Sequence, residues 1–196
     1  MVKKQQEKSQ QTKQELMTAA VELFGAKGFA QTAVAEITEK AGYAKGSFYR
    51  HWNSKDELFL CIVAEKLKRY RQAREEKSNS IANLEDAINV IWDFLESILD
   101  DKNWSTIFLE FTVYAAHSDA LRRLMNQSVY RLSAEIFADL VRGHMETDYP
   151  PEKLGAVNTA LFEGYLIQRA LGGTALAFSD VRESAVRLTL DYGTKR

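Results

Sequence analysis

Apolar residues recur every three or four positions along most of this chain, with polar residues between them. That spacing places the apolar side chains on one face of a helix. The first such stretch begins near Thr12 and ends at Gly28, and it includes Leu16, Leu23 and Phe24. Residues 1–10 are polar throughout, so we expect them to be disordered.

Further helical stretches follow to the end of the chain, and no run alternates as a strand would. The predicted helices after the first cover residues 34–41, 45–52, 54–77, 82–100, 103–117, 119–146, 151–172 and 180–192. Thr32 is the expected N-cap of the second helix, and Ser54 with Glu57 has the spacing of a capping box for the fourth. We therefore predict an all-α protein of about nine helices.

The segment from residue 32 to 58, TAVAEITEKAGYAKGSFYRHWNSKDEL, has the layout of a helix-turn-helix. Gly42 suits the positive φ of a sharp turn between the two short helices. The second helix begins with small residues, which allow close approach to the major groove. Donors for phosphate oxygens lie on its flank, namely Tyr49, His51 and Lys55. We expect Phe48 and Trp52 to be core residues.

The stretch from Leu16 to Leu58 resembles the DNA-binding domain of the TetR/AcrR family of regulators. The resemblance rests on Ala20, Leu23, Phe24, Gly28-Phe29, Thr32, Ile37, Ala41-Gly42-Tyr43, Lys45-Gly46-Ser47-Phe48-Tyr49, Ser54-Lys55 and Leu58. It covers about a quarter of the chain. Ala44 departs from the family pattern, which usually has Ser there, so a side-chain cap for the second short helix is missing.

The resemblance implies residues 1–55 as a three-helix DNA-binding domain and 56–196 as a larger helical ligand-sensing and dimerisation domain. It implies that Thr32, Tyr43, Tyr49 and Lys55 contact phosphates. The candidates for base edges are Lys45, Ser47 and Arg50, Gly46 allows close approach, and the role of His51 stays open. The expected partner is double-stranded DNA with a palindromic operator.

The resemblance also implies a homodimer, paired through the helices predicted at 151–172 and 180–192, and a small-molecule effector. Ala156, Ala160 and Gly164 would permit close helix approach. The candidate ligand-binding residues are Trp92, Trp104, Phe108, Phe111, Tyr114, Asn126, Tyr130, Tyr165 and Gln168. The expected function is a repressor that its ligand releases from the operator, although activation stays open.

Charge is unevenly distributed, although the net charge is only −1. Residues 1–55 carry nine Lys/Arg and five Asp/Glu, a balance of +4, whereas residues 56–196 carry seventeen and twenty-two, a balance of −5. The excess of positive charge in residues 1–55 is typical of a segment that binds nucleic acid. With 1 cysteine, Cys61, no apolar signal segment and no membrane-length apolar run, we expect a cytoplasmic protein without membrane contact.

Two other classes of function compete with DNA binding. An enzyme is disfavoured because the 3 histidines lie far apart, and no phosphate-binding glycine loop or nucleophile motif is present. His144 and Asp148 are spaced for one helix face, but two ligands make a poor metal site, so we predict no metal and no cofactor. The remaining alternative is a helical protein-interaction or adaptor module that does not bind DNA.

Overall fold

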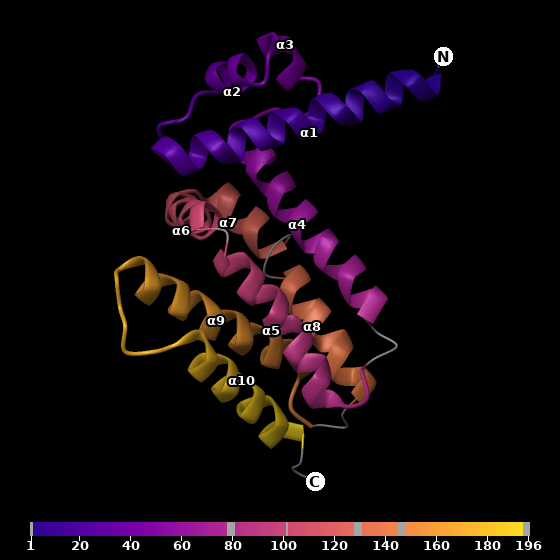
Figure 1. The fold of residues 1–196 in the computed structure, drawn as a ribbon, viewed down its shortest axis with the longest axis vertical. Coiled ribbons are helices and arrows are strands. Elements are labelled where there is room, and N and C mark those ends of the chain that lie inside the picture. The colour runs from indigo at the N-terminus through magenta and orange to yellow at the C-terminus, as the bar shows by residue number, and fades with distance from the viewer. Residues whose placement is uncertain (1, 78–80, 101, 128–130, 145–147, 194–196) are drawn as a thin grey trace. The chain divides into compact units, whose positions relative to one another are not determined.

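The computed structural model describes residues 2–77, 81–100, 102–127, 131–144 and 148–193, and every regular element in these ranges is a helix (Figure 1). The helices are α1 (Val2–Lys27), α2 (Val34–Lys40), α3 (Lys45–Phe48), α4 (Lys55–Lys77), α5 (Leu84–Asp100), α6 (Lys102–Ala116), α7 (Asp119–Met125), α8 (Arg131–His144), α9 (Pro151–Ala170) and α10 (Phe178–Gly193). The all-α prediction is confirmed.

Several helix boundaries differ from the sequence prediction, the third helix ending at Phe48 instead of residue 52, and two further differences are larger. Helix α1 begins at Val2, so the expectation that residues 1–10 are disordered is wrong for residues 2–10. Their Lys, Gln and Glu side chains have high helix propensity, and no glycine or proline interrupts them. The helix expected at 119–146 is divided into α7, which ends at Met125, and α8, which begins at Arg131. The described residues therefore hold ten helices instead of about nine.

The chain packs into two compact units, of which the first comprises Met1–Val63 and Lys102–Arg122. Its core is a cluster of phenylalanine rings from α1, α4, α6 and the chain after α1. The rings of Phe59 and Phe111 stack at 3.8 Å between centroids, and Phe29 meets Phe111 edge-on at 4.9 Å. Helix α6 thus belongs to the packing of the N-terminal helices. The boundary expected at residues 55/56 stays a prediction about function.

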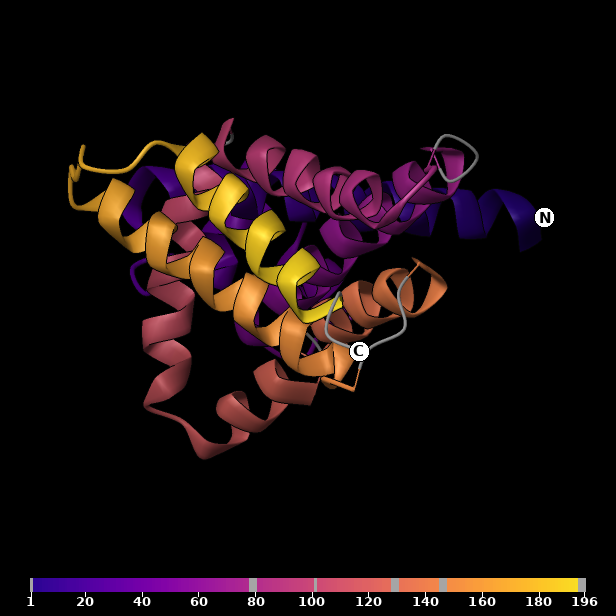
Figure 2. The same ribbon diagram turned by 90° about the horizontal axis from the view of Figure 1, so that it is seen from below.

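The second unit comprises Ala64–Asp101 and Arg123–Arg196. Within it α9 packs against both α8 and α10, and Figure 2 shows α9 and α10 side by side. Gly155 of α9 permits the approach to α8, because a Cβ there would lie 3.0 Å from backbone atoms of Ala134. A small residue at this crossing lets the helices pack closely.

A buried hydrogen-bond network joins three helices of the second unit. The Trp92 indole N–H of α5 donates to the side-chain oxygen of Asn158 on α9, at 3.1 Å. The Asn158 amide in turn donates to the carbonyl of Leu154 at 2.9 Å and to Thr189 Oγ1 of α10 at 3.2 Å. These polar groups are buried and paired, so the network fixes the three helices against one another.

Candidate nucleic-acid interface

The turn between α2 and α3 has the geometry that the sequence predicted. Gly42 takes φ +75°, and a Cβ added there would meet nothing within 4 Å. The N–H of Tyr43 donates to the carbonyl of Thr38 at 2.8 Å, and that of Gly42 donates to Glu39 at 3.0 Å. These bonds close the end of α2 as in a Schellman motif. Glycine is therefore favoured at position 42 by the positive φ of the turn and not by lack of space.

Helix α3 is a single turn, and its end is held by packing. Phe48 is fully buried and Trp52 nearly so, with their ring centroids 5.4 Å apart, which confirms both as core residues. The N-cap is Ala44, whose side chain makes no capping bond, as the departure from the family pattern implied. The buried ring fixes which face of α3 points outward.

The outward face of α3 carries the residues proposed to read bases. Lys45, Gly46 and Arg50 are exposed, and Tyr49 is 50% exposed, while Ser47 is half-buried. The Lys45 ammonium lies 5.9 Å from the centre of the Tyr49 ring. The structure thus brings these residues together on one surface, in the arrangement that a groove-reading helix requires.

Positive charge gathers beside this face. Burial lowers the pKa of His51, and the neighbouring cations Lys13 and Arg50 lower it further. Lys13 comes from α1 and was not singled out in the sequence, because its distance along the chain gave no sign that it lies near His51. The charges of Lys13 on α1 and of Arg50 after α3 therefore both act on the His51 ring.

Three of the residues expected to contact phosphates are engaged within the chain instead. Thr32 is only 2% exposed, and its hydroxyl donates to the carbonyl of Gly28 at 2.8 Å. The Tyr43 hydroxyl donates to the carboxylate of Glu15, which lowers the pKa of Glu15. Each side chain thus stabilises a local backbone or helix contact.

Lys55 is the third of these residues. Its ammonium donates to the carbonyls of Phe29 at 2.5 Å, Thr32 at 2.9 Å and Ala30 at 3.3 Å. Burial lowers the pKa of Lys55, and the charges of Asp56 and Glu110 oppose that shift. The side chain that was expected to face DNA is therefore turned into the protein.

The two expected helix caps differ in their outcome. The N-cap of α2 is Ala33 and not Thr32, because Glu36 accepts the Ala33 N–H at 2.8 Å while the Thr32 hydroxyl turns back to Gly28. At α4 the Ser54 hydroxyl accepts the Glu57 N–H at 3.1 Å, as predicted. The Glu57 carboxylate, however, accepts the N–H of Asn53 at 2.7 Å, so the reciprocal bond is shifted by one residue.

The candidate ligand-binding residues are distributed over both compact units. Those of the first unit are Trp104, Phe108, Phe111 and Tyr114, and those of the second are Trp92, Asn126, Tyr165 and Gln168. Tyr130 lies outside the described residues.

Within each unit, ring contacts link several of these residues, among them Trp104 with Phe108 and Phe111 with Tyr114. Trp104 and Phe111 are buried against Phe59, with stacked rings. In the second unit the rings of Trp92 and Tyr165 each lie 5.6 Å from that of Phe178 at the start of α10, a residue that the sequence analysis did not select. Their role in ligand binding stays a prediction.

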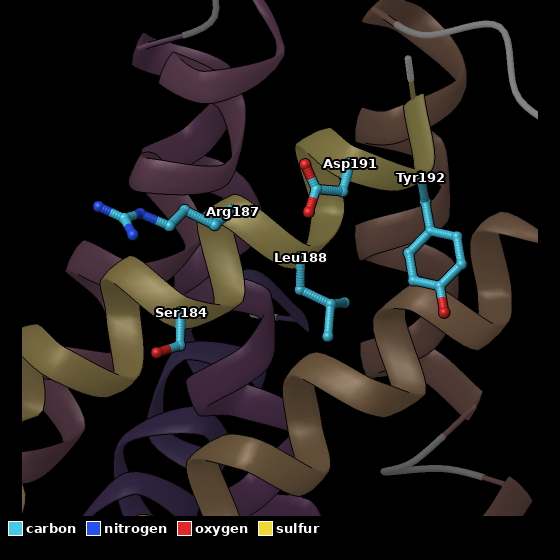
Figure 3. A pocket seen from close by; sticks show the side chains of 5 residues that line it. All are labelled: Ser184, Arg187, Leu188, Asp191 and Tyr192. Carbon is cyan, nitrogen blue, oxygen red and sulfur yellow. The ribbon is translucent and has the colours of Figure 1, made fainter. Parts of the chain in front are cut away.

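A pocket of about 420 Å³ opens along α10. Figure 3 shows its lining side chains, which all come from this helix: Ser184, Arg187, Leu188, Asp191 and Tyr192. These residues lie in the segment predicted to form the dimer and include none of the candidate ligand-binding residues.

Two further features concern metals and membranes. Among the described residues no three His, Cys, Asp or Glu side chains gather as they would around a metal ion. In the same part of the chain, no helix combines the length and hydropathy that crossing a bilayer requires.

Comparison with known proteins identifies the N-terminal segment. Residues 16–62 match the family model described as "Bacterial regulatory proteins, tetR family". The HTH-type transcriptional regulator TtgR of Pseudomonas putida is 40% identical to this chain over 63 residues, which are 32% of this chain and 30% of TtgR. The segment with the helix-turn-helix geometry is thus the segment that known regulators share.

Similarity also extends over nearly the whole chain at a lower level. The HTH-type transcriptional repressor AcnR of Corynebacterium glutamicum is 22% identical over 182 residues, covering 89% of this chain and 90% of AcnR. The crystal structure of the transcriptional regulator FadR of Bacillus subtilis in complex with stearoyl-CoA superposes with a TM-score of 0.70 and 18% identity, covering 90% of this chain and 96% of that one. The fold is therefore that of these regulators.

Proposed function

Because the chain belongs to the tetR family of bacterial regulatory proteins, we propose that it binds duplex DNA in a sequence-specific manner and represses transcription until a small molecule releases it. The observation that carries this proposal is the outward face of α3, with Lys45, Tyr49 and Arg50 exposed above a buried Phe48. Access to the chromosome implies a cytoplasmic location.

The proposed contacts follow the exposure of each side chain. Lys45, Ser47 and Arg50 read base edges, and Gly46 allows the helix to approach them. The Arg50 guanidinium is suited to a bidentate contact with guanine O6 and N7. Tyr49 and His51, together with Tyr43 if it exchanges Glu15 for a phosphate, contact the DNA backbone.

We propose that two copies pair through α9 and α10, so that two reading helices reach two half-sites. An exposed stripe along α9 supports this, because its residues are small or apolar and recur every three or four positions. The stripe consists of Ala156, Ala160 and Ile167 of α9 and of Leu171, the C-cap residue of that helix, with the half-buried Gly164 between them. Ile167 is 49% and Leu171 83% exposed, which is costly for large apolar side chains unless a partner covers them.

We propose that the ligand favours a dimer shape whose reading helices do not fit the operator, since only differential affinity for two shapes can move such an equilibrium. FadR of Bacillus subtilis, which has the same fold, was solved with stearoyl-CoA. A long-chain acyl-CoA is therefore the first effector to test.

The test begins with selection of duplexes by the purified protein, followed by titration against the selected duplex and variants of it. Arg50→Ala is expected to lose roughly 1–3 kcal/mol of discrimination at one or two base pairs. The charge-matched control is Arg122→Ala, which removes an arginine paired with Asp119 in the same compact unit. It should leave discrimination unchanged.

Salt dependence separates DNA binding from the adaptor alternative. A dimer that makes several phosphate contacts should lose affinity steeply as salt rises. Failure to bind any duplex at low salt, or an affinity that does not change with salt, would favour the adaptor. Equal losses on all duplexes for Arg50→Ala and Arg122→Ala would remove Arg50 from base reading.

A further inference from the structure

The loop between α1 and α2 is held at its amide groups by a carboxylate from α6. The N–H of Phe29 donates to Glu110 Oε2 at 2.8 Å, and the N–H of Ala30 donates to Glu110 Oε1 at 3.1 Å. Both oxygens of one carboxylate are therefore used by two consecutive amides. Charge-assisted bonds of this kind are stronger than those between neutral groups.

The carbonyl groups of the same loop are held from α4. The Lys55 ammonium donates to the carbonyls of Phe29 and Thr32, and it lies 4.3 Å from the centre of the Phe29 ring. A loop of six residues, Gly28 to Ala33, is thus fixed by an anion at its donors and a cation at its acceptors.

Gly28 makes room for this arrangement. It takes φ +91°, and a Cβ built at this position would lie 2.9 Å from Glu110 Oε1. A larger residue there would have to displace the carboxylate as well as adopt an unfavourable backbone conformation. The glycine and the carboxylate therefore fit each other.

The loop leads directly into the helix-turn-helix. Phe29 is fully buried, and Ala33, the last residue of the loop, is the N-cap of α2, which packs against α3. We propose that Glu110 and Lys55 are positioning residues for DNA binding, which hold the loop so that α2 and α3 are presented in the orientation that fits the groove. This inference rests on the proposed function, and it gives Lys55 a role other than phosphate contact.

The test compares Glu110→Gln with Glu39→Gln in the full-length protein, using the duplex selected above. Both changes remove one negative charge from the same compact unit, and Glu39 is exposed on α2. Charge alone predicts that both variants bind DNA more tightly, since a negative charge repels phosphates. Loss of positioning predicts instead that Glu110→Gln binds about tenfold more weakly than Glu39→Gln, because one amide of the loop loses its acceptor.

Hydrogen exchange of the Phe29 and Ala30 amides in free protein is the second measurement. It should accelerate about tenfold in Glu110→Gln and stay unchanged in Glu39→Gln. Affinities are expressed per active molecule after stoichiometric titration, so a partly unfolded sample does not imitate weak binding. As a second variant, Lys55→Gln should also accelerate exchange in the loop, whereas Lys8→Gln, on the exposed part of α1, should not.

The outcomes separate the two proposals. Wild-type protein that binds no duplex would refute the proposed function, and the positioning role with it. Wild-type binding together with a Glu110→Gln variant that binds as tightly as Glu39→Gln, or unchanged exchange at Phe29 and Ala30, would refute positioning alone.

Discussion

The two compact units hold their parts together by different chemistry. In the first, charged side chains at partial exposure, Glu110 and Lys55, bind the backbone of a loop. In the second, the neutral amide of Asn158 joins Trp92 and Thr189 in the interior. Both arrangements connect residues far apart in the sequence, but only the first is open to water and salt.

This difference suggests different mechanical roles. Partly exposed charged contacts can be lost one at a time, so removing one of them loosens the loop before α2 while its unit stays folded. A buried network loses all its bonds together, because water cannot replace them. The contacts of the loop before α2 can therefore be altered separately from the rest of the first unit, whereas the second unit contains a fixed frame that joins α5, α9 and α10.

The largest effect is expected from Asn158→Leu in the frame. The Trp92 N–H would lose its acceptor in a buried site, which costs about 1–3 kcal/mol. Chemical denaturation should record this loss, and DNA affinity per folded molecule should change little. A variant that keeps full stability would show that the network is not a fixed part of the fold.

The next effect distinguishes two glycines of the first unit. Gly28→Ala and Gly42→Ala both force alanine into a left-handed conformation, at roughly 1–2 kcal/mol each. Only Gly28→Ala also displaces the Glu110 carboxylate. Thermal unfolding should therefore place Gly28→Ala below Gly42→Ala, and loop exchange should accelerate in the former alone. Equal behaviour would mean that the carboxylate does not constrain the loop.

The smallest effect concerns how the stability of the fold changes as the pH is lowered. The ion pair with Lys27 and the N–H of Ala33 lower the pKa of Glu36 in the folded protein. Its contribution is complete above the ordinary glutamate pKa and is lost as pH falls through the lowered folded value. Glu36→Gln should thus reduce Tm slightly at neutral pH and converge with wild type in acid. A constant difference in Tm across that range would contradict this assignment.

Local features of the helix-turn-helix were predictable because the residues that decide them are neighbours in the sequence. Gly42 indicated the turn, and the spacing of Phe48 and Trp52 indicated the buried side of α3. The exposed face of α3 followed from these two features. Long helices were predictable for the same reason, since periodicity is a local property.

Contacts across the sequence were not predictable in this way. Glu110 was the one charged residue in a long apolar stretch of α6, but nothing local paired it with the amide of Phe29. Lys55 was expected to face phosphates, because nothing in the sequence indicated the three carbonyls that it binds. These carbonyls belong to a loop more than twenty residues earlier, which lies beside Lys55 only in the folded protein. Thr32 failed as an N-cap for a local reason instead, because its hydroxyl donates to the carbonyl of Gly28, four residues earlier.

The fit between Gly28 and Glu110 has a consequence for how such a protein can diverge. Any side chain at position 28 carries the strain of its positive φ, and unless position 110 holds a shorter side chain it must also displace the carboxylate. The two sites should therefore covary among descendants of this chain. If the first 63 residues were replaced by those of a relative, α6 would face a loop of different sequence. A working chimera should therefore need the relative's residue at position 110 as well.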